Sequence, residues 1–94
     1  MALFAVQYTY TDDAEKTQAV RPEHRDHLRE LLAAGTLLLA GPFAGTPGGL
    51  LVVRADSEEG ALAAVDGDPF LREGVIIDRS AREWTVSIGE LPGA

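Results

Sequence analysis

The order of apolar segments along this 94-residue chain most constrains its fold. Two stretches, 22–34 and 57–67, space their apolar residues as amphipathic helices do. One of these helices follows the first strand-like segment, and the other follows the third. The strand-like segments, rich in branched and aromatic residues, are 2–10, 36–43, 48–56 and 75–89.

The resulting order, βαββαβ, predicts an α+β fold of the ferredoxin-like kind, with a four-stranded antiparallel sheet and two helices on one face. A chain of this length has room for one hydrophobic core, so residues 1–94 are expected to form a single domain. Pro22 suits the first turn of the first helix. Gly35 suits a left-handed cap at its end, and Asp56 or Ser57 can cap the second helix.

The C-terminal third is expected to continue with a short turn or single helical turn at 68–74. The fourth strand, 75–89, is predicted to bend near Ser80, and residues 91–94 to form a frayed tail.

The predicted strands 36–43 and 48–56 are apolar on both faces, whereas an antiparallel sheet with one wet face should alternate apolar and polar residues. In the first strand Phe4 and Val6 share one face, yet Leu3 and Ala5 occupy the other. The chain has no cysteine and therefore no disulfide to stabilise so small a core. A second copy covering the exposed face, in a dimeric α/β-barrel-like assembly, is the predicted solution.

Composition excludes several classes of function. Eight basic residues face fifteen acidic ones, a net charge of −7, so a nucleic-acid partner is not expected. No apolar run approaches the ~18 residues that a membrane span needs, and positions 1–10 do not resemble a signal peptide. We therefore predict a cytoplasmic protein without a membrane partner. Hydrolase, dinucleotide and phosphate-loop motifs do not occur, so no cofactor is expected.

A histidine stands out in the segment RPEHRDHLREL, residues 21–31. His24 falls in the same helical stripe as Leu28 and Leu31, so a titratable group points inward. It could be a core histidine hydrogen-bonded to a backbone carbonyl. Alternatively it could be a general acid and base, because imidazole titrates near neutral pH.

Asp68 is the natural carboxylate to test as the partner of His24. Because Asp68 precedes Pro69, it could equally be the N-cap of a following helical turn. The sequence does not determine the distance between the two side chains. Arg21 could bind an anionic substrate or remain solvated. A metal shared by His24 and His27 lacks a supporting motif, and no metal is predicted.

These residues together resemble the YciI-related family of small dimeric ferredoxin-like proteins. The matching features span most of the chain: Arg-Pro-x-His at 21–24, the helix end at Gly35, Gly-Pro at 41–42, Asp-Pro-Phe at 68–70 and Gly74. The resemblance implies a site built from His24 and Asp68. It also implies cofactor-free elimination or isomerisation on small ring-shaped acids or phenols.

The leading hypothesis is therefore a cofactor-free lyase or isomerase acting on a small-molecule substrate. Asp68 would orient His24, which moves the proton. Arg21 would hold a carboxylate or phenolate between apolar walls that include Phe43 and Phe70. The alternative is a non-catalytic binding or accessory module that uses the same pair as a polar anchor. A His24–Asp68 hydrogen bond that opens onto a cleft favours the enzyme; a solvent-filled gap between them favours the module.

Overall fold

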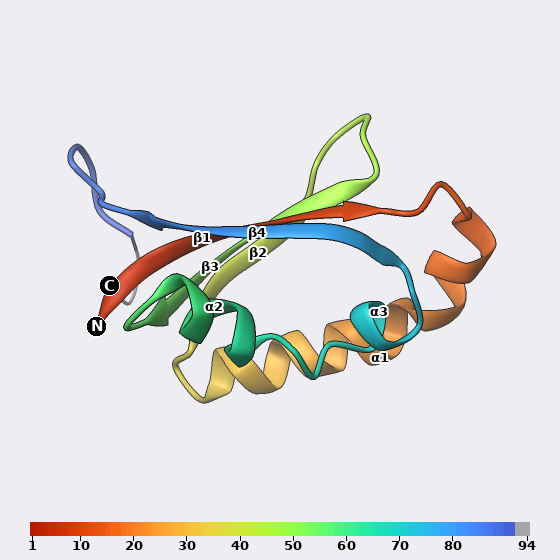
Figure 1. Cartoon of the computed structure of the whole chain (residues 1–94), viewed down its shortest axis with the longest axis horizontal. Coiled ribbons are helices and arrows are strands. Elements are labelled where there is room, and N and C mark those ends of the chain that lie inside the picture. Colours follow the sequence, from red (N-terminus) through yellow and green to blue (C-terminus); the bar gives the residue numbers. More distant parts are fainter. Residues whose placement is uncertain (92–94) are drawn as a thin grey trace.

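A computed structural model describes residues 1–91 and contains one four-stranded sheet (Figure 1). The strands lie in the spatial order β2-β3-β1-β4, and all three neighbouring pairs are antiparallel. This arrangement confirms the predicted ferredoxin-like α+β fold. The elements are β1 Ala2–Tyr10, α1 Ala14–Ala33, β2 Leu37–Pro42, β3 Gly48–Ala55, α2 Glu58–Ala64, α3 Pro69–Arg72 and β4 Ile76–Trp84.

The three helices lie on one side of the sheet, and the core fills the space between the two layers (Figure 1). Alternate residues of β1 point into this space because side chains in a strand alternate between faces. The helices close the core with small or aromatic side chains. The buried residues include Phe4, Val6, Tyr8, Leu51, Val53, Ala61, Val65 and Phe70.

Helix α1 begins earlier than the sequence predicts. It starts at Ala14 rather than Pro22, and Asp13 caps it by accepting a hydrogen bond of 3.1 Å from the Lys16 amide. Between this cap and Pro22 only Thr17 is buried, so the first two turns have no apolar stripe to reveal them. Pro22 lies inside the helix and cannot donate to the preceding turn. The first turns stand at an angle to the rest of α1 in Figure 1.

The other helix ends follow local sequence signals. Gly35 has a φ of 84°, and the amides of Gly35 and Thr36 donate to the carbonyls of Leu32 and Leu31 at 3.1 Å each. This is the left-handed cap predicted for the end of α1. Ser57, one of the two predicted caps of α2, accepts a hydrogen bond of 3.0 Å from the Gly60 amide.

Strand β4 is shorter than predicted. It ends at Trp84, which pairs with Leu3, and because β1 begins at Ala2 the partner strand runs out there. The expected bend near Ser80 is absent from the pairing. The register instead shifts where Thr9 opposes Asp78 and Tyr10 opposes Ile76, which leaves one extra residue in β4.

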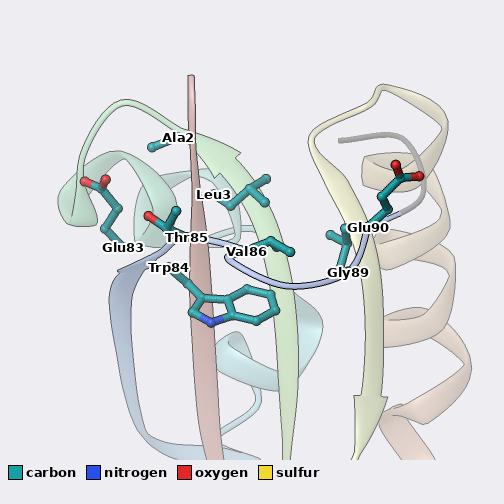
Figure 2. A pocket seen from close by; sticks show the side chains of 9 residues that line it. Ala2, Leu3, Glu83, Trp84, Thr85, Val86, Gly89 and Glu90 are labelled. Atoms are coloured by element: carbon teal, nitrogen blue, oxygen red, sulfur yellow. The ribbon is translucent and has the colours of Figure 1, made fainter.

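No helix of the described residues covers the face of the sheet opposite α1, α2 and α3, and only the segment after β4 curves past Leu3 at one end of it (Figure 2). Leu3 and Ala5 point to this side, and Leu39 and Trp84 are 41% and 44% exposed. No helix within residues 1–91 is long and apolar enough to cross a membrane. The expected frayed tail, residues 91–94, lies outside the described residues except for Leu91.

Candidate functional site

His24 is the most buried side chain in its part of α1. It is 7% exposed, whereas Leu32, eight residues further along the helix, is 52% exposed. Helix α1 packs against α3 and β2, and His24 lies on the side that faces α3. The inward-pointing histidine predicted from the helical pattern is therefore present. It lies near the middle of the helix rather than at its start.

The imidazole of His24 is hydrogen-bonded to the carboxylate of Asp68. Its Nδ1 lies 2.7 Å from Oδ1 and 2.9 Å from Oδ2, and Asp68 is fully buried. Oδ1 also accepts a hydrogen bond of 2.9 Å from the Phe70 amide, so Asp68 is the N-cap of α3. The two interpretations of Asp68 weighed from sequence, helix cap and histidine partner, are both realised. A buried carboxylate needs such donors to offset its lost hydration.

The hydrogen bond determines which nitrogen of His24 is available for chemistry. An ionised Asp68 accepts from Nδ1–H, which leaves the lone pair of the neutral imidazole on Nε2. Nε2 has no hydrogen-bond partner in residues 1–91 and is not one of the buried unpaired atoms, so it remains accessible. His24 lines a cavity of about 420 Å³. The pair is thus a hydrogen bond that opens onto a cleft.

Phe70 forms the floor beside the imidazole. Its ring stacks on that of His24 with centroids 3.7 Å apart and planes 6° from parallel. Tyr10 meets the same phenyl ring edge-on at 5.2 Å and 77°. Aromatic packing of this kind restricts the imidazole to one orientation, and a ring face also attracts a cation if His24 becomes protonated.

The cavity brings together most of the residues expected from sequence. Arg21 lines it together with His24 and Phe70. Phe43 does not; it lines an adjoining hollow of about 320 Å³ that shares Tyr10 and Arg21 with the first. The remaining wall residues were not expected and are Tyr10, Arg25, Leu28, Ala40, Gly41, Pro42 and Leu51.

Tyr10 is the most informative of the missed residues. Burial and the nearby charge of Asp68 raise its pKa to about 12, against an opposing effect of Arg21. Its hydroxyl therefore stays protonated at neutral pH and can donate a hydrogen bond. The sequence places Tyr10 on the helix side of β1, but nothing in it shows that this strand end meets α3. Arg25 could have been found, since it lies four residues after Arg21.

Tyr8, one step further into the core, has its hydroxyl buried without a hydrogen-bond partner in the described residues. Burial, followed by the charge of Asp68, raises its pKa well above the ordinary tyrosine value. Across residues 1–91 no group of three or more histidine, aspartate or glutamate side chains is placed to hold a metal ion.

A separate hollow of about 560 Å³ lies at the end of the sheet where β4 stops (Figure 2). In Figure 2 the side chains of Leu3, Trp84 and Val86 gather on one side of β1, while Glu83 points to the other. The segment after β4 curves round to Gly89 and Glu90, which complete the lining. Among the described residues, its charged lining is Glu83 and Glu90, so it contains no histidine–carboxylate pair like that of His24 and Asp68.

Comparisons with known proteins show the family of this chain. The family model of the YCII-related domain matches residues 1–85. Protein YciI from Escherichia coli is 36% identical over 74 residues, which cover 68% of this chain and 76% of that protein. A protein of Emericella nidulans, derivative of benzaldehyde biosynthesis cluster protein C, is 32% identical over 76 residues, covering 69% and 78%.

A solved structure shares the fold: 5-chloro-2-hydroxyhydroquinone dehydrochlorinase from Burkholderia phenoliruptrix AC1100, in complex with 2,5-dihydroxybenzoquinone. The TM-score is 0.75 at 20% identity, and the match covers 88% of this chain and 93% of the other. The chain belongs to the YCII-related domain family.

Proposed function

We propose that this YCII-related protein is a cofactor-free lyase or isomerase that moves a proton on a small ring-shaped acid or phenol. The observation that carries the proposal is the 2.7 Å contact between His24 Nδ1 and the buried Asp68 carboxylate, at the wall of a 420 Å³ cavity. A histidine fixed in one tautomer, with its other nitrogen open to a ligand, is the arrangement that general base catalysis requires.

The proposed reaction begins with Nε2 of His24 removing a proton from a carbon or hydroxyl next to a ring carbonyl. The positive charge on the imidazolium is stabilised by Asp68 and by the face of Phe70. In an isomerisation the same proton returns at another carbon. In an elimination the electron pair instead expels a leaving group from the neighbouring carbon, and the proton is later lost to solvent. Tyr10 would donate a hydrogen bond to the ring oxygen that gains negative charge, and Arg21 would hold a carboxylate or phenolate of the substrate.

The relatives support this chemistry without defining the substrate. One structural relative is a dehydrochlorinase bound to a dihydroxybenzoquinone, and one sequence relative belongs to a benzaldehyde biosynthesis cluster. Both names involve small aromatic rings. The cavity of this chain has a comparable character, with Phe70 and Tyr10 at its wall and the apolar Leu28 and Leu51 beside them.

The proposal includes a cytoplasmic homodimer with no nucleic-acid or membrane partner. The sheet face opposite the helices supports self-association, because Leu39 and Trp84 are exposed on it beside Leu3 and Ala5. These apolar side chains gain free energy when a second sheet covers them. The net charge of −7 argues against a phosphate backbone as partner.

The test is proton exchange in deuterated water, followed by NMR on a panel of small cyclic enones and phenols. The parent protein should exchange ring-adjacent hydrogens, and general base catalysis is worth roughly 10²–10⁴-fold in rate. His24→Gln should abolish the exchange. Asp68→Asn keeps an oxygen for the Phe70 amide, but its amide group favours the wrong imidazole tautomer, so it should lose most of the rate.

Nitrogen-15 shifts of the His24 ring provide a second readout, because they distinguish the two tautomers. The parent should carry its proton on Nδ1, and Asp68→Asn should move it to Nε2. If panel compounds perturb residues of the cavity yet no hydrogen exchanges in any variant, the protein is a binding module and the enzyme proposal fails.

A further inference from the structure

Three arginines form a row along α1. Arg21, Arg25 and Arg29 are spaced four residues apart, so their side chains are neighbours on one ridge of the helix. Like charges at this spacing repel each other. The chain has fifteen acidic residues and only eight basic ones. Its composition therefore contains enough carboxylates to pair with every arginine.

Only one member of the row has such a partner. Arg29 pairs with Asp26 at 3.4 Å, and neither Arg21 nor Arg25 has a carboxylate within 4.0 Å in residues 1–91. Elsewhere Arg72 pairs with Glu23 and Arg79 with Asp66, whereas Arg54 and Arg82 also lack a carboxylate within 4.0 Å in the described residues. Within the row on α1, the two unpaired guanidinium groups are the two that line the cavity of His24, and Arg29 does not line it.

The rest of the cavity matches one kind of ligand. Leu28, Leu51 and Phe70 offer an apolar and aromatic surface for a ring. The positive charge of Arg21 reaches the Tyr10 hydroxyl, where it opposes the rise in the tyrosine pKa. A guanidinium binds a carboxylate through two parallel hydrogen bonds, which gives both strength and orientation.

We propose that Arg21 and Arg25 form a carboxylate-binding subsite and that the ligand of this cavity is therefore a ring compound bearing a carboxylate group. The ring lies against Phe70 and Leu28, the carboxylate between the two guanidinium groups, and the far side of the ring toward His24. Binding also relieves the repulsion between the arginines. The claim that this ligand is a substrate rests on the proposed function, whereas the claim that it binds does not.

Benzoate and benzamide test the subsite, because they share a ring and differ in charge. Each is titrated into the full-length protein at low salt and followed by amide NMR. Benzoate should bind at least about tenfold more tightly than benzamide, as expected for hydrogen bonds between charged groups, and should shift Tyr10 and His24. Equal affinity for the two compounds would overturn the proposal.

Matched variants of the row separate a specific subsite from general positive charge. Arg25→Gln and Arg21→Gln should each weaken benzoate binding by about tenfold and leave benzamide binding unchanged. Arg29→Gln removes the same charge one turn further along and should change neither. If Arg29→Gln weakens benzoate binding as much as Arg25→Gln does, the effect is nonspecific attraction and the subsite does not exist. The amide spectra report directly that each variant is folded.

The two proposals fail in different ways. If benzoate binding depends on Arg21 and Arg25 but no panel compound exchanges a proton, the subsite is supported and the enzyme proposal is not. If neutral rings exchange their hydrogens through His24 while carboxylates have no advantage, the enzyme proposal stands and the subsite is overturned.

Discussion

The two faces of the sheet differ in which side chains they bury and which they expose. The face beneath the helices is closed by the chain itself, and its interior holds three polar side chains, Thr17, His24 and Asp68. The opposite face leaves Leu39 and Trp84 exposed at 41% and 44%. The face beneath the helices therefore buries some groups that prefer water, while the opposite face exposes two large groups that avoid it.

The difference separates two roles within one small domain. Burial of a carboxylate lowers stability unless it is fully hydrogen-bonded, so the His24–Asp68 pair is a feature that packing alone would not select. Exposure of apolar side chains to water likewise costs free energy, and association with a second copy can recover it. The covered face, which lies beneath the helices, is the candidate for chemistry. The open face, on the opposite side of the sheet, is the candidate for assembly. Mutations on each side should affect one property without the other.

Loss of Asp68 should have the largest effect. Asp68→Ala removes the partner of His24 and the N-cap of α3 at once, and should lower the free energy of unfolding by about 3 kcal/mol. Asp68→Asn retains an acceptor for the Phe70 amide and should cost less. Urea denaturation of the three proteins measures both values. Equal losses in the two variants would mean that the helix cap contributes nothing.

The covered face was largely predictable because its signals are local. The order of helices and strands along the chain follows from the spacing of apolar residues, and His24 was expected to point inward because it shares a helical stripe with Leu28 and Leu31. Asp68 was recognised as a candidate, but its distance from His24 depends on how α3 packs on α1, which no local pattern contains. Tyr10 was missed for the same reason.

Two errors also have physical causes. The start of α1 was missed because Pro22 resembles a first-turn proline, whereas the cap at Asp13 sits before two polar turns with little to bury. The end of β4 was misplaced because residues 85–89 keep a strand-like composition, although the pairing of β4 with β1 ends at Trp84 and Leu3. Strand length depends on the partner strand as well as on the sequence itself.

A charge on the open face should weaken self-association. Trp84→Glu places a carboxylate among apolar side chains of the proposed interface and should cost on the order of 2 kcal/mol of dimer stability or more, the scale of a buried tryptophan anchor. Analytical ultracentrifugation of parent and variant measures it. Leu32→Glu, at an exposed leucine on α1, is the control. A parent protein that sediments as a monomer would contradict the assignment of this face.

Alkaline pH should reveal the burial of the tyrosines on the covered face. The pKa of Tyr10 is raised to about 12, against about 10 in an unfolded chain. The unfolded state therefore loses its proton first, so stability is intact below pH ~10 and falls as pH rises toward ~12. The loss should be about 1–2 kcal/mol. Tyr10→Phe should reduce this decline when urea unfolding is compared at pH 9 and pH 11.5.

The smallest change in the free energy of unfolding is expected at Tyr8. It tests how far the polar groups of the covered face extend into the core. Its hydroxyl is buried beside the charge of Asp68 but has no hydrogen-bond partner in residues 1–91. Removing a paired buried hydroxyl normally costs about 1 kcal/mol, whereas removing an unpaired one relieves a desolvation penalty. Tyr8→Phe should therefore leave the free energy of unfolding within about 0.5 kcal/mol of the parent or raise it. A loss above about 1 kcal/mol would instead mean that the hydroxyl is bonded in solution, most simply through water to Asp68. The polar network of the covered face would then extend past His24 into the core.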